Sequence, residues 1–205
     1  MTLEGPEGSG KTVVARRLAE ELQRRGLKVV LTREPGGTRL GERVREILLG
    51  RDDLGIDPRA DALLFNAARA QLVAEVVRPA LDAGEVVICA RFADSTLAYQ
   101  GYGAGLPILD LRAIATVATG GMDPDLTVLL DVDPEVGIQR KREGARNRFE
   151  SIDLDFHRRV RAGFLELARD EPERWRVVDS SRQIDRVFDD VLAIVLAEVG
   201  VAGAA

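Results

Sequence analysis

The stretch Gly5-Pro6-Glu7-Gly8-Ser9-Gly10-Lys11-Thr12 decides the fold class of this chain. It fits the pattern GxxxxGK(S/T), a loop whose glycines let successive backbone N–H groups turn inward toward phosphate oxygens. Lys11 adds a positive charge for the β- and γ-phosphates, and the Thr12 hydroxyl is placed to ligate Mg²⁺. The stretch is therefore predicted to bind a nucleoside triphosphate.

Residues 13–25 continue this loop as an amphipathic helix. Val14, Leu18 and Leu22 share one face of it, and Gly26 follows as a C-terminal stop. The positive end of the helix dipole is then expected under the phosphates. The alternative is a glycine-rich turn that happens to precede a helix, but the order of strand, loop and helix favours the phosphate-binding loop.

Length and composition bound the class of protein. At 205 residues and 45% hydrophobic composition, the chain is long enough for one well-packed domain and too short for two of ordinary size. The formal net charge of -5 disfavours a general nucleic-acid binder. No apolar run approaches the ~20 residues that a membrane span needs, and no signal peptide is visible. We expect a cytoplasmic protein that binds neither nucleic acid nor a membrane.

Short apolar runs alternate with helical patterns along the whole chain. The expected strands are residues 1–4, 27–31, 86–90, 126–130 and 175–179. Because a strand that feeds such a loop needs about 5 residues, we expect that the natural chain begins earlier. The alternation predicts an α/β protein with the P-loop NTPase fold: a five-stranded parallel sheet, helices on both faces, and a single domain over residues 1–205.

Charged residues follow the expected strands, at the sheet edge where ligands of such folds gather. Arg33 and Glu34 follow the second strand, Arg91 the third, and Asp131 the fourth. A guanidinium group can hold a phosphate through two hydrogen bonds, so the two arginines indicate a second, anionic substrate. The alternative for either arginine alone is an ordinary surface ion pair.

Residues 140–148 hold five basic residues, Arg140, Lys141, Arg142, Arg146 and Arg148, interrupted by a glycine. A run of this kind is most often a solvated charged face. Phosphoryl transfer, however, benefits from cations that close over the transferring phosphate. The run is therefore also a candidate for a short arginine-rich lid over about residues 140–150.

Five stretches together closely resemble bacterial thymidylate kinase. They are GPEGSGKT at residues 5–12, TREPGGT at 32–38, LLFNAARAQLV at 63–73, ARFADSTLAYQGYG at 90–103 and LLDVDPEVG at 129–137. The match runs in order over nearly the whole chain, and TREPGGT with STLAYQG is specific to that family among P-loop kinases. The resemblance implies transfer of the γ-phosphoryl group of ATP to dTMP, giving ADP and dTDP, with Mg²⁺ and usually as a homodimer.

The resemblance also implies roles for individual residues. ATP would bind to Gly5, Pro6, Glu7, Gly8, Ser9, Gly10, Lys11 and Thr12. The residues implied for dTMP are Arg33 and Arg91 for the phosphate, Phe65 and Arg69 for the base, and Ser95, Thr96, Tyr99 and Gln100 for the base and sugar. An aromatic face and a forked donor suit a pyrimidine.

Catalytic and metal-binding residues follow in the same way. Glu7 in the loop resembles the subgroup whose catalytic arginines come from the lid. The candidate catalytic residues are therefore Arg140, Arg142, Arg146 and Arg148 of the lid, beside Glu7, Lys11 and Arg91. Thr12, Glu34 and Asp131 are expected to orient Mg²⁺ or its waters. For each of the two carboxylates, a buried structural role is the alternative.

One position departs from the family pattern. Ala90 stands before Arg91, where the family has an aspartate near Mg²⁺ and the phosphates, and alanine can neither ligate a metal nor accept a proton. The chain could therefore be slow, could use Asp131 or Glu34 instead, or could be a non-catalytic nucleotide-binding homologue. A kinase of another nucleoside monophosphate is a further alternative. A GTPase is disfavoured because the chain has no Asn-Lys-x-Asp motif.

Overall fold

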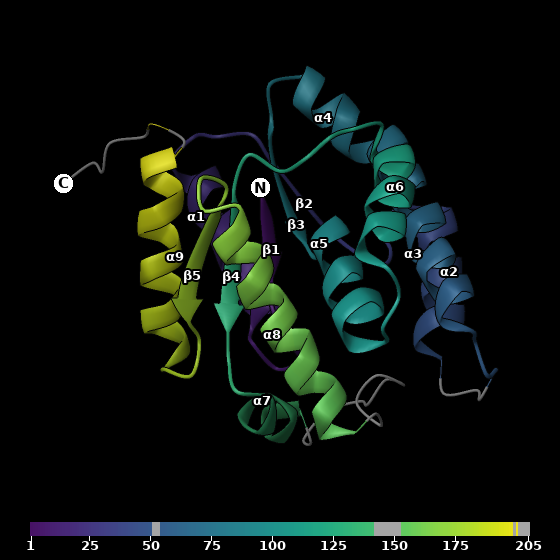
Figure 1. The fold of residues 1–205 in the computed structure, drawn as a ribbon. Helices are drawn as coiled ribbons and strands as arrows, with labels where there is room; N and C mark the ends of the chain where they lie inside the picture. The colour runs from purple at the N-terminus through teal and green to yellow at the C-terminus, as the bar shows by residue number, and fades with distance from the viewer. Residues whose placement is uncertain (51–53, 142–152, 199, 201–205) are drawn as a thin grey trace.

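The computed structural model describes residues 1–50, 54–141, 153–198 and 200. Within them, one parallel sheet has the strand order β2-β3-β1-β4-β5 (Figure 1). The strands are β1 Thr2–Glu4, β2 Val29–Arg33, β3 Val86–Ala90, β4 Thr127–Asp131 and β5 Trp175–Asp179. The predicted five-stranded parallel sheet is confirmed.

Helices connect and cover these strands. They are α1 Lys11–Arg24, α2 Arg39–Leu49, α3 Pro58–Leu72, α4 Arg78–Asp82, α5 Ala93–Thr96, α6 Ile108–Thr119, α7 Pro134–Lys141, α8 Leu154–Asp170 and α9 Ile184–Glu198. Two π-helical segments, η1 Val73–Val77 and η2 Leu97–Gly103, continue α3 and α5. No helix of the described ranges is long and apolar enough to cross a membrane.

Successive residues of one strand pack against different helices, which places helices on both faces of the sheet. In β4, Val128 and Leu130 pack with α1 and α9, whereas Leu129 between them packs with α8. This alternation follows from the period of two in a strand. Because both faces are covered, β4 is a nearly continuous apolar run, as is typical of a central parallel strand.

Two of the helices begin at side chains of residue types that favour helix N-caps. The Thr38 side chain accepts from the backbone N–H of Gly41 at the start of α2. The Asp57 side chain accepts from the N–H of Arg59, with proline at the first position of α3. From there the chain stays helical through η1 to the end of α4, and α3 packs against α2, α6 and η2, with its Arg69 bonded to Glu34 at the end of β2.

Residues of the site follow the carboxyl ends of three neighbouring strands. β2, β3 and β1 lie side by side, and their carboxyl ends lead into Glu34, Arg91 and the loop of Gly5, respectively. β3 ends one residue before Arg91, from which α5 and η2 continue. These groups therefore lie at the same edge of the sheet although they are tens of residues apart in sequence.

Candidate functional site

The loop between β1 and α1 closes around two left-handed glycines. Gly8 has φ 71°, and a Cβ there would lie 1.9 Å from the carbonyl oxygen of Gly137 in α7. Gly10 has φ 88° and caps the N-terminus of α1. Only glycine takes such angles without strain, so the predicted spacing matches a loop pressed tightly against a neighbouring helix.

Lys11 curls back over this loop. Its Nζ donates to the carbonyl oxygens of Gly5 and Pro6, at 2.9 and 2.7 Å, and to Ser9 Oγ at 2.9 Å. The side chain is buried, with 8% exposed, and it lines the main cavity. The Lys11 ammonium group therefore lies at the opening of the loop, where the phosphates of a nucleotide would bind.

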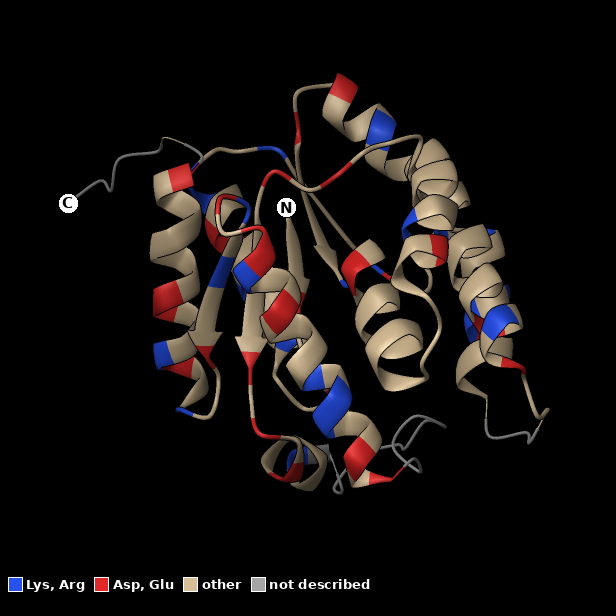
Figure 2. Cartoon of the chain, viewed as in Figure 1, with Lys and Arg blue, Asp and Glu red and all other residues tan. Residues whose placement is uncertain are grey.

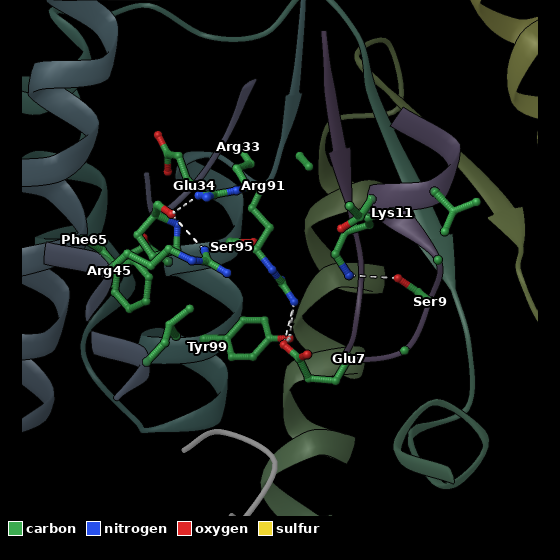
Figure 3. A pocket seen from close by; sticks show the side chains of 18 of the residues that line it. Glu7, Ser9, Lys11, Arg33, Glu34, Arg45, Phe65, Arg91, Ser95 and Tyr99 are labelled. Carbon is green, nitrogen blue, oxygen red and sulfur yellow. Dashed lines mark hydrogen bonds and ion pairs between the residues drawn. The ribbon is translucent and has the colours of Figure 1, made fainter. Parts of the chain in front are cut away.

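A cavity of about 380 Å³ opens beside the loop (Figure 3). Its lining includes most of the residues that the sequence singles out, together with Arg45, Leu49 and Pro35, which sequence reasoning missed. The predicted residues on its wall are Glu7, Gly8, Ser9, Gly10, Lys11, Thr12, Arg33, Glu34, Phe65, Arg91, Ser95, Thr96, Tyr99, Gln100 and Arg140. Gly5, Pro6, Arg69 and Asp131 are not part of the wall.

Arg91 stands at the centre of this cavity. Its guanidinium donates to Glu7 Oε1 at 2.7 Å, to the Tyr99 hydroxyl at 3.0 Å, to Ser95 Oγ at 3.1 Å and to the Gly5 carbonyl at 3.2 Å (Figure 3). Burial disfavours its charge, but the neighbouring Tyr99, Glu7 and nearby Glu4 more than offset burial and raise the pKa of Arg91. The site therefore holds a permanent cation.

The backbone of Arg91 is left-handed, with φ 72°, the single positive φ among the described non-glycine residues. Three contacts hold it there. Its N–H donates to the Leu3 carbonyl at 3.0 Å, the next N–H donates to Glu4 Oε1 at 2.7 Å, and Cys89 Sγ lies 2.9 Å from its carbonyl oxygen. Such strain is found at functional sites when the surroundings enforce it.

Glu4 is a carboxylate that sequence reasoning missed. It is fully buried and accepts from the Phe92 N–H and, at 2.5 Å, from the Ser95 hydroxyl. Burial and the nearby charge of Asp94 raise the pKa of Glu4 from 4.5 to about 7. No sequence pattern indicated this role, because it depends on the contacts that the start of α5 makes with the end of β1.

Two further arginines approach the same cavity. Arg33 donates to the Pro35 carbonyl at 3.0 Å and to Glu42 at 3.1 Å, and its side chain is 42% exposed. Arg45 of α2 donates to the same carbonyl at 2.9 Å. Burial, with the nearby charge of Arg33, lowers the pKa of Arg45. Arg45 could have been found only as one of several arginines on a helix face, so its place was not predictable.

Arg69 is held inside the protein rather than on the cavity wall. It is 1% exposed and donates three hydrogen bonds to Glu34, the shortest at 2.7 Å, and further ones to Asn66, Thr96 and the Phe92 carbonyl. Burial raises the pKa of Glu34, and the charge and hydrogen bonds of Arg69 act in the opposite direction. The pair ties α3 to the end of β2 and to the start of α5.

The residues predicted for the base lie at the other end of the cavity. Phe65 projects from α3 opposite Tyr99 of η2 (Figure 3), while Thr96 and Gln100 complete the wall. Gln100 Nε2 donates to Asp61 at 2.8 Å. The π-helical winding of η2 is a local feature that sequence periodicity did not predict; such windings recur at functional sites.

The oxygen donors near the loop show how this site could hold Mg²⁺. Thr12 lines the cavity at the start of α1. Asp131 instead receives two hydrogen bonds from Arg161, both at 2.8 Å, and Glu34 is bound by Arg69. No cluster of three acidic, histidine or cysteine ligands occurs within the described ranges. Mg²⁺ keeps waters and binds largely through substrate phosphates, so the site fits it with Thr12 as the protein donor, while the two carboxylates are engaged elsewhere.

The proposed lid is represented by one residue. Arg140 of α7 lines the cavity and donates to the carbonyls of Ser180 and Ser181, each at 2.7 Å. Arg142, Arg146 and Arg148 lie outside the residues that the structure describes. Ala90 also lines the cavity, at the end of β3.

Comparison with known proteins identifies similar sequences. The profile of the thymidylate kinase family matches residues 3–191. Thymidylate kinase of Deinococcus radiodurans is 54% identical over 196 residues, covering 95% of each chain, and that of Roseiflexus sp. (strain RS-1) is 49% identical over 208 residues, covering 95% of this chain and 92% of the relative.

A solved structure is also similar. The crystal structure of thymidylate kinase from Ehrlichia chaffeensis superposes with a TM-score of 0.78 at 34% identity, covering 95% of this chain and 96% of the other. The match of the family profile, the relatives and the fold all extend over nearly the whole sequence. The chain belongs to the thymidylate kinase family.

Proposed function

We propose that this chain transfers the γ-phosphoryl group of ATP to dTMP, giving dTDP and ADP, and that residues 1–205 act as one domain. The observation that carries the proposal is the shared cavity. Lys11 and the phosphate-binding loop form one end, Phe65 and Gln100 form the other, and Arg91 stands between them. A nucleotide with its phosphate at Arg91 would therefore face a second nucleotide on the loop.

Catalysis in this arrangement is mostly positioning and neutralisation of charge. Backbone N–H groups of the loop and Lys11 would hold the β- and γ-phosphates of ATP. Arg91, with Arg33 and Arg45 beside it, would hold the phosphate of dTMP in line with the γ-phosphate. Glu7 binds Arg91 at 2.7 Å and so keeps that guanidinium aimed across the loop. No covalent enzyme intermediate is required.

When bound, Mg²⁺ would neutralise charge on the phosphates, with the Thr12 hydroxyl as its protein donor. The metal roles predicted for Glu34 and Asp131 lose support, because arginines bind both carboxylates.

Arg142, Arg146 and Arg148 remain proposed catalytic residues of the lid. The cytoplasmic location stays a prediction from composition.

The base would lie against Phe65, with Thr96, Tyr99 and Gln100 around its edge. Arg69 was predicted to donate to a base carbonyl. Its burial behind the wall supports a different contribution, in which it fixes Thr96 through a hydrogen bond of 3.0 Å and so shapes the base site from behind.

Release of ADP, coupled to a spectroscopic assay, tests this function. We expect turnover with dTMP and at least about 10-fold lower kcat/KM with dCMP, dGMP and AMP, because a site built to hydrogen-bond one base rejects others strongly. Turnover with another monophosphate in preference to dTMP would identify a kinase of that acceptor. Binding of ATP and dTMP without ADP release would support the non-catalytic alternative that Ala90 raises.

A homodimer is also proposed, through α3 and α6. These two helices pack side by side (Figure 1), and charged residues are sparse along α6 compared with α8 (Figure 2). Leu63, Leu109 and Val117 on them are 56%, 81% and 85% exposed, which is unusual for large apolar side chains that do not meet a partner. Sedimentation velocity should give twice the chain mass.

The surface of the dimer is tested by substitution. Val117→Asp should shift the chain toward the monomer, whereas Leu165→Asp on α8, where the residue is 38% exposed, should not. A monomeric wild-type chain at micromolar concentration, or equal effects of the two variants, would contradict the proposed surface.

A further inference from the structure

Gln100, at the base end of the cavity, is oriented by a residue of another helix. Its Nε2 donates to Asp61 Oδ2 of α3 at 2.8 Å, and the two residues are 3% and 5% exposed. A carboxylate oxygen accepts and does not donate, so the amide nitrogen of Gln100 has to be the atom that faces Asp61. The orientation of this amide is thus fixed by the chemistry of its partner rather than by a choice between two similar atoms.

Asp61 is itself held on a rigid element. It lies in the first turn of α3, where its backbone N–H donates to the Asp57 carbonyl at 2.9 Å and where the helix dipole favours a negative charge. Phe65, one turn further along the same helix, lines the cavity. The carboxylate that orients Gln100 and the ring expected to stack on the base are therefore set by one helix.

This orientation decides which base edge the site accepts. With one N–H of Nε2 engaged by Asp61, the Gln100 amide cannot turn over, so it presents its oxygen, which can only accept, and its second N–H to a ligand. A thymine base offers an N3–H donor beside its 4-oxo group. A cytosine base of the same shape offers a lone pair on N3 and an amino group at C4, so two acceptors would meet at N3 and one buried partner would go unsatisfied.

We propose that Asp61 is a specificity-determining positioning residue. It holds the Gln100 amide with its oxygen toward the base, and this selects 4-oxo pyrimidines over 4-aminopyrimidines. The proposal rests on the proposed function, since it assumes that the base of the monophosphate lies against Phe65. Asp61 does not touch the reacting atoms; it acts through Gln100.

The test compares dTMP with the 5-methyl derivative of dCMP, which has the same ring, methyl group and phosphate. Asp61→Asn keeps the size of the side chain and supplies an N–H₂ that can donate to the Gln100 oxygen, which lets the Gln100 nitrogen face the base. We expect the ratio of kcat/KM for dTMP to that for 5-methyl-dCMP to fall at least about 10-fold, as for a misdirected buried hydrogen bond. KM for ATP should stay unchanged.

Two controls separate orientation from stability. Asp57→Asn changes a carboxylate to an amide at the exposed cap of the same helix, and it should leave the ratio unchanged. Asp61→Glu keeps a carboxylate and should keep a preference for dTMP, whereas Asp61→Gln should lose it; this second pair serves if Asp61→Asn does not fold, as judged by its thermal melting.

The outcomes divide clearly. A wild-type preference ratio in a folded Asp61→Asn variant overturns the role of Asp61. If kcat/KM for dTMP and kcat/KM for 5-methyl-dCMP fall equally in both Asp61→Asn and Asp61→Glu, the proposal is also overturned, since that result assigns a purely structural role to Asp61. A wild-type enzyme that does not turn over dTMP overturns the proposed function instead, before any variant is compared.

Discussion

At the scale of single residues, the buried pair of Arg69 and Glu34 has the largest energetic consequence. Both side chains are nearly inaccessible, 1% and 3% exposed, with N–O at 2.7 Å. Removing one partner of such a pair leaves an uncompensated buried charge, which costs about 3–5 kcal/mol. We therefore expect Arg69→Ala to lower the free energy of unfolding by that amount, measured by urea denaturation.

A surface pair provides the control for this change. Arg43 and Glu46 lie 3.0 Å apart but are 75% and 65% exposed. Exposed pairs contribute about 0–1 kcal/mol, so Arg43→Ala should change the stability little. A loss after Arg69→Ala no larger than that after Arg43→Ala would show that the buried pair has no special weight. A loss of dTMP binding with full stability would instead favour the direct base contact predicted from the sequence.

Ala90 is the second residue at which we expect a substitution to have a measurable effect, here on kcat. It ends β3, pairs in register with Leu3, and lines the cavity. Neither Glu34 nor Asp131 can replace a carboxylate at this position without giving up its arginine. We expect Ala90→Asp to raise kcat about 10-fold, by orienting Mg²⁺ and its waters, with little change in KM for dTMP.

The matched variant for that experiment is Ala90→Asn. It adds the same volume without the charge, so a gain in both variants would be due to packing, and a gain in the aspartate variant alone would be due to the carboxylate. Measurement is by steady-state kinetics at saturating Mg²⁺. No gain in either variant would mean that the chain reaches its full rate without a strand-end carboxylate.

At the scale of elements, the strands and most helices were predictable, because apolar runs and caps are local signals. The last strand was predicted at its observed bounds, and Thr38 and Asp57, which cap α2 and α3, are residue types that favour N-caps. The first helix was placed within two residues of its start. The second strand begins at Val29, two residues later than expected.

The features that the sequence did not predict depend on contacts distant in sequence. Glu34 and Arg69 are 35 residues apart, and Glu4 and Ser95 are 91 apart. No local pattern indicates which arginine will meet which carboxylate, so Arg69 was predicted at the base, and Arg45 and Asp61 were not singled out. The resemblance identified the residues near the cavity, but only the fold distinguishes the wall from the layer behind it.

The contact between α7 and the phosphate-binding loop gives a prediction at this scale. A Cβ on Gly137 would lie 2.1 Å from the carbonyl oxygen of Glu7, so backbone has to give way. We expect Gly137→Ala to lower the free energy of unfolding by about 1–3 kcal/mol, the usual cost of overpacking. Because the displaced atoms belong to the loop, KM for ATP should rise while KM for dTMP changes less.

Gln139→Ala supplies the control, since this residue lies on the exposed side of the same helix. It introduces the same side chain without a clash, and stability and KM for ATP should remain near wild type. If Gly137→Ala also leaves both quantities unchanged, then α7 and the loop are not packed as the structure has them.

At the scale of the whole molecule, three carboxyl groups are buried near the sheet. Glu4, Glu34 and Asp94 are each 5% exposed or less, and of the three only Glu34 lines the cavity. Arg69 binds Glu34, and Arg174 binds Asp94 through two hydrogen bonds of 2.7 and 3.0 Å. Glu4 is bound instead by neutral donors, the Phe92 N–H and the Ser95 hydroxyl. Burial therefore disfavours the ionised form of Glu4 more than that of the other two carboxyl groups.

The pKa of Glu4, raised from 4.5 to about 7 by burial and by Asp94, links this cost to pH. Below pH 4.5 the carboxyl is protonated in both the folded and unfolded states, so it costs nothing. Between about pH 4.5 and pH 7 the folded state binds more protons than the unfolded state, so stability falls as pH rises. Above pH 7 the full cost, about 3 kcal/mol, is present.

Glu4→Gln removes this titration while its amide oxygen can still accept from the Phe92 N–H. The variant should therefore gain stability over the wild type as pH is raised from 5 to 8, by about 2–3 kcal/mol, measured by urea unfolding at each pH. Glu135→Gln, at a carboxylate that is 63% exposed, should show no such gain. A stability difference between Glu4→Gln and wild type that is the same at pH 5 and pH 8 would mean that Glu4 is ionised throughout this range, with Arg91 and the Ser95 hydroxyl stabilising its charge in the folded protein.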